Sequence, residues 1–195
     1  MRLLLLADTE DPSLWDYYTP QKTAGVDLVI SAGDLKGPYL SFLVTMVNRP
    51  LLYVHGNHDS SYEKWPPEGC DCIDDELVTV KGLRILGLGG SQIISDGYYY
   101  SEKDMRKRIR RLRRKIKKAG GVDIVVTHSP ALGYGDEDNP SHRGYETFLE
   151  LIDEFHPRFF IYGHVHESYS HEFTRRLSRG DTTLINASGK YFLDI

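Results

Sequence analysis

Residue types that commonly bind divalent metals occur in five short clusters spread along the 195-residue chain. The clusters are Asp8, Gly33-Asp34, Gly56-Asn57-His58-Asp59, Thr127-His128 and Gly163-His164-Val165-His166. Two divalent ions about 3.5–4 Å apart need a bridging carboxylate, further oxygen and nitrogen ligands, and open positions for water and phosphate. The clusters contain all of these ligand types, although each cluster taken alone is a weak signal. Together they predict a two-metal site that acts on phosphate esters.

Each cluster directly follows a short apolar run that has the length of a buried strand. The runs are Leu3–Ala7, Leu28–Ser31, Leu51–Val54, Ile124–Val126 and Phe159–Ile161. Runs that are apolar on both faces are typical of strands covered on both sides, as in α/β sheets. In such sheets ligands bind on the loops beyond the carboxyl ends of the strands. We therefore expect the five polar loops to meet at one edge of the fold.

The remaining segments fill in the layers of a single domain covering residues 1–195. Further strands are predicted at Leu77–Val80, Leu83–Leu88, Thr182–Ile185 and Phe192–Ile195, and helices at Leu40–Val47, Glu102–Ala119 and Tyr145–Phe155. In the helix Glu102–Ala119 the apolar residues share one face, and Gly120-Gly121 ends the helix. The sequence has no internal repeat, low-complexity tract or linker, so one domain of ordinary size is expected.

Composition argues against several other classes of protein. With a formal net charge of −4, the chain as a whole gives no reason to expect nucleic acid or an anionic membrane as a partner. No stretch approaches the roughly 20 apolar residues of a membrane span. The first apolar run is too short for a signal peptide and reaches Asp8 at once, so a cytoplasmic location is expected. Cys70 and Cys72 are too close for an ordinary disulfide and too few for a zinc site.

In this order, each after a predicted strand, the five clusters resemble the calcineurin-like metallophosphoesterase superfamily. The resemblance covers nearly the whole chain, from Asp8 to His166, and the Gly-Asn-His-Asp and Gly-His-Val-His segments are its most specific parts. It implies an α/β fold, a four-layer α/β/β/α sandwich of two mixed sheets with outer helices. It also implies an enzyme that hydrolyses phosphate esters with two divalent metal ions.

The family pattern assigns roles to individual residues. It implies that the first metal is bound by Asp8, Asp34 and His166, and the second by Asp34, Asn57, His128 and His164. Asp34 suits the bridging position, because one carboxylate can offer an oxygen to each ion. In this scheme a metal-activated water attacks phosphorus, while His58 protonates the leaving oxygen and holds the phosphate. Asp59 is expected to orient the His58 ring.

One residue departs from the family pattern. The family usually opens with Asp-x-His, whose His binds the first metal, whereas this chain reads Asp8-Thr9-Glu10. If Glu10 coordinates, the first site is rich in oxygen and favours Mn²⁺ or Mg²⁺ over Zn²⁺; Mn²⁺ is the expected ion, with Fe, Ni, Zn or Mg as alternatives. The extra carboxylate lowers the positive charge of the site, which favours singly charged phosphodiesters over doubly charged monoesters. In the alternative interpretation Glu10 does not coordinate, and the first site is empty or weak.

Two further features have both a functional and a purely structural interpretation. The loop 133–144 follows the His128 strand end and is expected to overhang the site. There His142 and Arg143 can meet the phosphate or the leaving group; otherwise the loop is an exposed polar one. The segment 102–118 holds 11 of the 24 Lys and Arg residues. It is either a solvated helix packed through its apolar face, or a contact surface for nucleic acid or an acidic partner.

Two classes of function therefore stand against each other. The leading hypothesis is an enzyme that hydrolyses phosphate esters, with phosphodiesters favoured over monoesters. The alternative is a catalytically weak or inactive binding scaffold on the same fold, because some relatives keep metal-like residues but lose the catalytic histidine. The presence of His58 and of every second-metal ligand favours the enzyme, whereas Glu10 favours the scaffold. The sequence leaves the physiological substrate, the native metal and the oligomeric state open.

Overall fold

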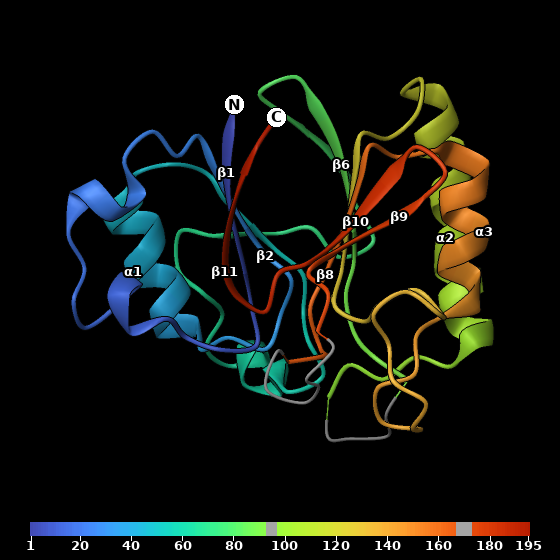
Figure 1. Cartoon of the computed structure of the whole chain (residues 1–195), viewed down its shortest axis with the longest axis horizontal. Helices are drawn as coiled ribbons and strands as arrows, with labels where there is room; N and C mark the ends of the chain where they lie inside the picture. Colours follow the sequence, from blue (N-terminus) through green and yellow to red (C-terminus); the bar gives the residue numbers. More distant parts are fainter. Residues whose placement is uncertain (93–96, 167–172) are drawn as a thin grey trace.

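Two β-sheets pack face to face at the centre of the molecule, and helices cover their outer faces (Figure 1). The computed structural model describes residues 1–92, 97–166 and 173–195. The first sheet contains, in spatial order, β11 (Gly189–Asp194), β1 (Arg2–Ala7), β2 (Leu28–Ser31), β3 (Leu51–Tyr53) and β4 (Asp71–Cys72). The second contains β5 (Leu77–Val80), β6 (Leu83–Leu88), β7 (Ile124–Thr127), β8 (Phe159–Tyr162), β10 (Thr182–Asn186) and β9 (Arg176–Arg179).

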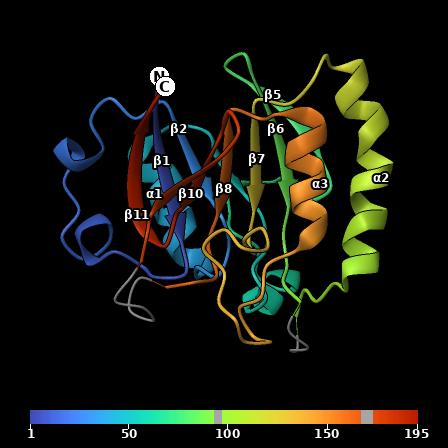
Figure 2. The ribbon, with the colours of Figure 1, turned by 45° about the vertical axis from the view of Figure 1, so that its right-hand side comes forward.

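Both sheets combine parallel and antiparallel strands. β1 to β4 run parallel and β11 pairs antiparallel with β1. In the second sheet β6, β7, β8 and β10 run parallel, while β5 and β9 are antiparallel edge strands. The helix α1 (Gly37–Val47) covers the first sheet, and α2 (Glu102–Lys118) and α3 (Glu146–Phe155) lie side by side on the second (Figure 2). The predicted α/β sandwich of two mixed sheets with outer helices is confirmed.

The strands are apolar on both faces because each sheet has one face in the central layer and one face under helices. On β1, Leu3 and Leu5 belong to the core between the sheets, whereas Leu4 and Leu6 pack with side chains of α1. On β7, Ile124 and Val126 face the core between the sheets, whereas Val125 faces outward and packs with residues of α2 and α3. Successive strand residues face opposite sides, so burial on both sides gives a continuous apolar run in the sequence.

Some element boundaries differ from those predicted. The helix α1 begins at Gly37 rather than Leu40, because Pro38 in its first turn is preorganised for a helix start and needs no hydrogen bond there. The closing strand β11 begins at Gly189 rather than Phe192, since it pairs with β1 along its whole length. The short strands β4 and β9 were not predicted, because neither has an apolar run. Three short 3₁₀ helices complete the described elements: η1 (Pro12–Leu14), η2 (Pro20–Thr23) and η3 (Asp59–Glu63).

The helix α2 follows its predicted pattern closely. Ser101 caps its start, with the hydroxyl oxygen accepting the N–H of Asp104 at 3.2 Å. Its apolar face is buried against the second sheet and α3 through Met105, Ile109, Leu112 and Ile116. No helix in the described part of the chain has the length and apolar character needed to cross a membrane.

The loops that carry the candidate ligands gather at the edge of the molecule where β1, β2, β3, β7 and β8 end. The two chain termini meet at the opposite edge (Figure 1), where the amino group of Met1 donates to the carbonyl of Ile195 at 2.8 Å. The parallel arrangement within each sheet therefore brings the five predicted loops to a single side.

Candidate metal centre

His128 lies among the loops that follow β2, β3 and β7. Its ring is fully buried. Nδ1 lies 2.8 Å from the carbonyl oxygen of Ala32, which can only accept, so Nδ1 donates this hydrogen bond. The other nitrogen, Nε2, faces Asn57 Oδ1 at 3.0 Å and Asp34 Oδ2 at 3.3 Å. Nε2 is thus surrounded by acceptors, so a proton or a cation must lie among these three atoms.

The charges of Asp34 and His128 are strongly coupled. Burial opposes the imidazolium, but the charge and hydrogen bond of Asp34 outweigh it and raise the pKa of His128 to about 9. Burial likewise opposes the carboxylate, yet the nearby His128 lowers the pKa of Asp34 to about 2. In the metal-free protein the position between the two side chains is therefore taken by a proton, which a divalent ion would replace.

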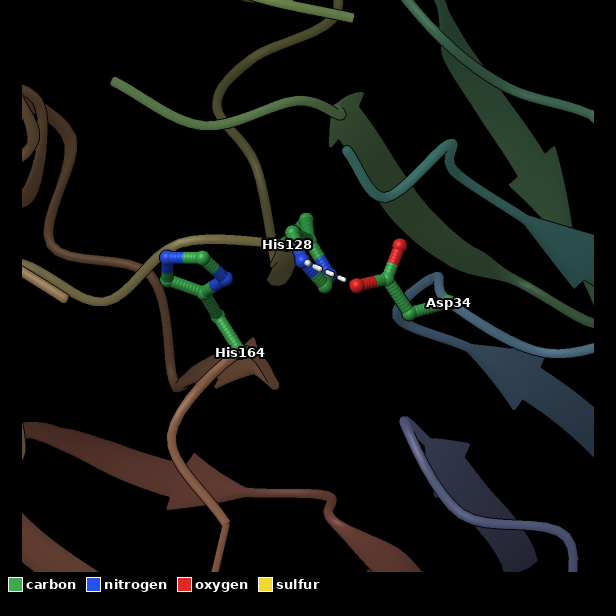
Figure 3. A group of neighbouring side chains, drawn as sticks. All are labelled: Asp34, His128 and His164. Carbon is green, nitrogen blue, oxygen red and sulfur yellow. Dashed lines mark ion pairs between the residues drawn. The ribbon is translucent and has the colours of Figure 1, made fainter. Parts of the chain in front are cut away.

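His164 approaches the same region from the end of β8. Its Nε2 donates to the carbonyl oxygen of Ser141 at 2.9 Å, which leaves Nδ1 as the free nitrogen. That nitrogen faces His128 and Asp34 (Figure 3), and the two imidazole rings lie 4.8 Å apart between centroids. Burial, followed by the proximity of His128, lowers the pKa of His164 to about 3. His164 is therefore neutral and able to offer a lone pair.

Three predicted ligands thus form a compact group. One ligand atom from each of Asp34, His128 and His164 lies within 4.8 Å of the other two (Figure 3). Asn57 joins this group through its contact with His128. The four residues predicted for the second metal come from four different loops and meet at one place, as a ligand set for one ion requires.

Asp8, at the end of β1, lies beside this group. Its Oδ1 accepts the main-chain N–H of His164 at 2.8 Å. Its Oδ2 is buried and has no hydrogen-bond partner among the described residues. Burial raises the pKa of Asp8, although the charges of His128 and His166 and the His164 N–H partly oppose the shift. His166 is half-buried and near enough for its charge to act on Asp8.

The backbone is strained at three of the candidate ligands. Asp8, Asp34 and His164 have φ angles of 63°, 57° and 70°, in the left-handed region that costs a non-glycine residue about 1 kcal/mol. The adjoining loops also touch: a Cβ on Gly56 would lie 1.9 Å from Asp34 Oδ1. Strain of this kind persists where the surrounding structure holds side chains in a required arrangement.

The residues next to Asn57 connect the ligand loops. Asp59 is buried, and its Oδ2 accepts the N–H of Asp34 at 2.9 Å and the N–H of Gly56 at 2.7 Å. Burial and the charge of Asp34 raise the pKa of Asp59 to about 6. The N–H of His58 donates to Asp34 Oδ1 at 2.8 Å, and His58 itself is exposed. The contacts of Asp59 are therefore with the main chain of the two ligand loops rather than with a ring.

Glu10 pairs with a neighbouring cation. Its Oε1 lies 3.4 Å from Nζ of Lys36, which follows the candidate ligand Asp34 by two residues. Glu10 does not belong to the compact group formed by Asp34, His128 and His164. This ion pair shows one way in which the chain balances the extra carboxylate.

The loop 133–144 covers one side of the group. Asp136 holds its two ends, accepting the N–H groups of Gly133 at 2.7 Å and Gly144 at 3.0 Å. The ring of His142 lies 5.3 Å from that of His164, and its Nδ1 is 3.1 Å from Oε2 of Glu137. Arg143 is exposed and lines surface hollows with residues of its own loop and with Gln92. Of the two predicted substrate contacts, His142 is the one placed against a candidate ligand.

Comparison with known proteins identifies the family. The model of the calcineurin-like phosphoesterases matches residues 1–168, most of the chain. The chain belongs to this family. Its members typically bind divalent metal ions, and the group of Asp34, His128 and His164 is a candidate site for one.

Several relatives of this chain are known by sequence. The UPF0046 protein K07C11.7 of Caenorhabditis elegans is 29% identical over 191 residues, covering 83% of the chain and 62% of that protein. Metallophosphoesterase domain-containing protein 1 of Homo sapiens is 31% identical over 123 residues, covering 61% of the chain and 35% of that protein. The chain thus spans about three-fifths of the length of the first relative and about a third of the second.

Solved structures share the fold at low sequence identity. One crystal structure matches with a TM-score of 0.71 at 14% identity, covering 99% of the chain and 94% of its own. TT1561 of Thermus thermophilus matches with a TM-score of 0.60 at 14% identity, covering 96% and 89%. A structure described as a novel archaeal phosphodiesterase matches with a TM-score of 0.52 at 17% identity, covering 100% and 93%.

A second group of possible metal ligands links the two sheets. His55 Nδ1 lies 2.6 Å from Asp74 Oδ2 and 3.7 Å from Cys72 Sγ. Asp74 Oδ1 accepts the N–H of Gly89, just beyond β6. Burial opposes the charged ring, but the hydrogen bond with Asp74 outweighs it and raises the pKa of His55 to about 9. The Asp74 carboxylate therefore joins the loop after β3, through His55, to the loop after β6, through Gly89.

Proposed function

We propose that this chain is a metal-dependent hydrolase of phosphate esters that uses two divalent ions. The observation that carries the proposal is the convergence of His128 Nε2, Asn57 Oδ1 and Asp34 Oδ2. Three acceptors facing one another in a buried place are stable only with a positive charge between them. The buried Oδ2 of Asp8, without a hydrogen-bond partner among the described residues, is a further oxygen that a cation would satisfy. The residues present therefore fit a divalent metal.

The proposed ligand sets are those of the family pattern with Glu10 added. The first ion is held by Asp8, Glu10, Asp34 and His166, and the second by Asp34, Asn57, His128 and His164. His128 and His164 each donate the other ring N–H to a main-chain carbonyl, an arrangement that fixes the tautomer of a metal-binding histidine. When bound, the ions activate a water molecule and neutralise the charge that develops on the phosphate oxygens.

Two further residues are proposed to act beside the ligands: His58 protonates the leaving oxygen, and Asp59 positions the ligand loops. His58 is exposed at the start of η3, where its ring can reach a bound ester and donate a proton to the leaving oxygen. Its main-chain N–H donates to Asp34 Oδ1, so the backbone of the proposed proton donor is tied to the carboxylate proposed to reach both ions. Asp59 acts on the reaction through the loops of Asp34 and Gly56, as a positioning residue.

His58→Ala is expected to lower the turnover of bis-p-nitrophenyl phosphate with Mn²⁺ by about 10²–10⁴-fold, the usual contribution of a general acid. The bound metal should stay unchanged, because the hydrogen bond that the structure describes between His58 and a proposed ligand comes from the His58 main chain, which the substitution keeps. Turnover and elemental analysis of the same preparations test both parts. If neither wild type nor variant hydrolyses the ester with any of Mn²⁺, Mg²⁺, Fe²⁺, Ni²⁺ or Zn²⁺ supplied, the binding-scaffold alternative replaces this proposal.

We expect phosphodiesters to be hydrolysed faster than monoesters, and Mn²⁺ to be the preferred ion. Glu10 and its neighbours surround the ions with oxygen ligands, which favours hard metals and lowers the net positive charge that a dianionic monoester needs. The fold likeness to an archaeal phosphodiesterase supports the same ester class. Turnover of bis- and mono-p-nitrophenyl phosphate under equal conditions compares the two; faster monoester hydrolysis contradicts the preference.

His142→Ala is expected to reduce turnover by about tenfold, whereas Arg143→Ala should leave it unchanged. His142 packs against the ring of the proposed ligand His164, and the Arg143 side chain is exposed on its loop. Loss of this contact leaves the His164 ring less firmly held, and a metal ligand must be held accurately. Equal turnover of the His142 variant and the wild type would show that the loop is only a polar cover.

A further inference from the structure

The exposed ridge of α2 is a row of cations. Six exposed side chains form this ridge, here called the crest: Lys103, Lys107, Arg110, Arg111, Arg114 and Lys118. At 3.6 residues per turn they share the side of α2 opposite its buried apolar face. With a rise of about 1.5 Å per residue, the crest is about 22 Å long.

The acidic neighbours of α2 neutralise its flanks and leave the crest charged. On the side of α3, Arg106 pairs with Glu150 at 2.7 Å and Arg113 with Glu154 at 2.9 Å. On the side of β5, Arg108 pairs with Asp75 and Lys115 with Glu76, both at 2.8 Å.

In the described part of the chain, no crest residue has an acidic side chain within ion-pair distance. The one acid beside the crest, Asp104, lies at the helix start, where it interacts electrostatically with Lys107 and Lys103. With six cations against this one carboxylate, the crest is a patch of net positive charge on a protein whose formal net charge is −4.

We propose that the crest binds the phosphate backbone of a single-stranded nucleic acid. Apart from the consecutive pair Arg110 and Arg111, each crest residue has another three or four positions away, so their side chains lie about 5–6 Å from one another and can meet successive phosphates along one extended strand. A single ridge presents one line of cations, which matches the phosphates of one strand, whereas a helix that reads a duplex lies in a groove and faces the base edges. The crest has no aromatic residue, so binding is independent of base sequence.

An anionic membrane fits the crest less well. A helix that inserts into a membrane surface needs apolar residues exposed beside its cations, and those of α2 are buried against the second sheet and α3. An acidic protein is distinguished from a nucleic acid by the polyglutamate comparison in the test below. The crest also starts at the edge of the molecule that holds the candidate metal centre, since Gly97 lies against the main chain of Asn57 and Tyr98 stacks on His55 just before α2 (Figure 2).

The test measures binding of a fluorescent oligothymidylate of about 20 nucleotides to the full chain. EDTA is present throughout, so failure of the proposed hydrolysis does not affect the result. The wild type should bind with log Kd rising linearly with log salt, with a slope near 4 if all six cations engage, at about 0.7 per phosphate neutralised. The crest variant Lys107→Gln/Arg110→Gln/Arg114→Gln should lower this slope by about 2 and bind about 100-fold more weakly at 0.1 M salt.

A matched control removes the same charge elsewhere. Lys22→Gln/Arg49→Gln/Arg158→Gln changes three exposed cations away from α2 and should bind within a few-fold of wild type. The single variant Arg114→Gln, expected to lower the slope by about 0.7, serves if the triple crest variant does not fold. Absence of binding at about 50 mM salt, equal weakening by the crest and control variants, or tighter binding to polyglutamate or phosphatidylserine vesicles would each overturn the proposal.

Discussion

Asp34→Asn is expected to lower turnover of bis-p-nitrophenyl phosphate by at least about 10³-fold, a loss of about 4 kcal/mol of transition-state stabilisation. The amide keeps the shape of the side chain, so its oxygen can still accept the N–H of His58 and its NH₂ can face Nε2 of His128. The protein should therefore fold. What disappears is the one carboxylate proposed to reach both ions, together with the charge that holds the proton on His128.

Metal content separates this effect from simple misplacement of the substrate. Elemental analysis should show clearly less than two ions per chain in Asp34→Asn, against two in the wild type loaded with Mn²⁺. Asp123→Asn is the matched control, because Asp123 pairs with Arg84 at 2.6 Å just before β7, away from the candidate centre. It should retain full turnover and metal content. A variant at Asp34 that keeps a tenth of the wild-type turnover would contradict a bridging role.

The sequence predicts the position of those candidate ligands that directly follow a buried strand. His128 and His164 follow β7 and β8, whose apolar runs are buried on both faces, so their place at the carboxyl edge follows from the sheet. Asp34 follows β2 in the same way. The order of the layers was predictable from the resemblance, and the double burial of β1 explains why its run is uninterrupted.

The parts that could not be predicted depend on main-chain groups and on contacts between loops. The carbonyls of Ala32 and Ser141 set the tautomers of His128 and His164, and a carbonyl oxygen has no signature in a sequence. The pairing of Glu10 with Lys36 depends on how two loops approach one another. Pro38 is the exception, because a proline in the first turn was a readable signal for the start of α1.

Asp59 is another residue whose contacts the sequence does not predict, although its sequence position suggests a chemical role. Its place after Asn57 and His58 suggested that it orients the His58 ring. In the structure its carboxylate accepts two main-chain N–H groups, one from the loop after β2 and one from the loop after β3. The sequence places Asp59 near the centre, but only the path of the two loops decides which donors it meets.

Asp59→Ala is accordingly expected to destabilise the fold by about 3 kcal/mol, because two buried N–H groups lose their acceptor at about 1–3 kcal/mol each. The carboxylate is itself unfavourably buried beside Asp34, as its raised pKa shows, and relief of that repulsion offsets part of the loss. For a chain of this length the midpoint of thermal unfolding should fall by roughly 10 °C. Asp59→Asn keeps an acceptor oxygen in place and should recover most of the stability.

His58→Ala, one residue away but exposed, should leave the midpoint unchanged while lowering turnover. If Asp59→Ala instead unfolds at the wild-type temperature and loses only turnover, Asp59 acts on the reacting groups directly and the positioning role assigned to it is wrong.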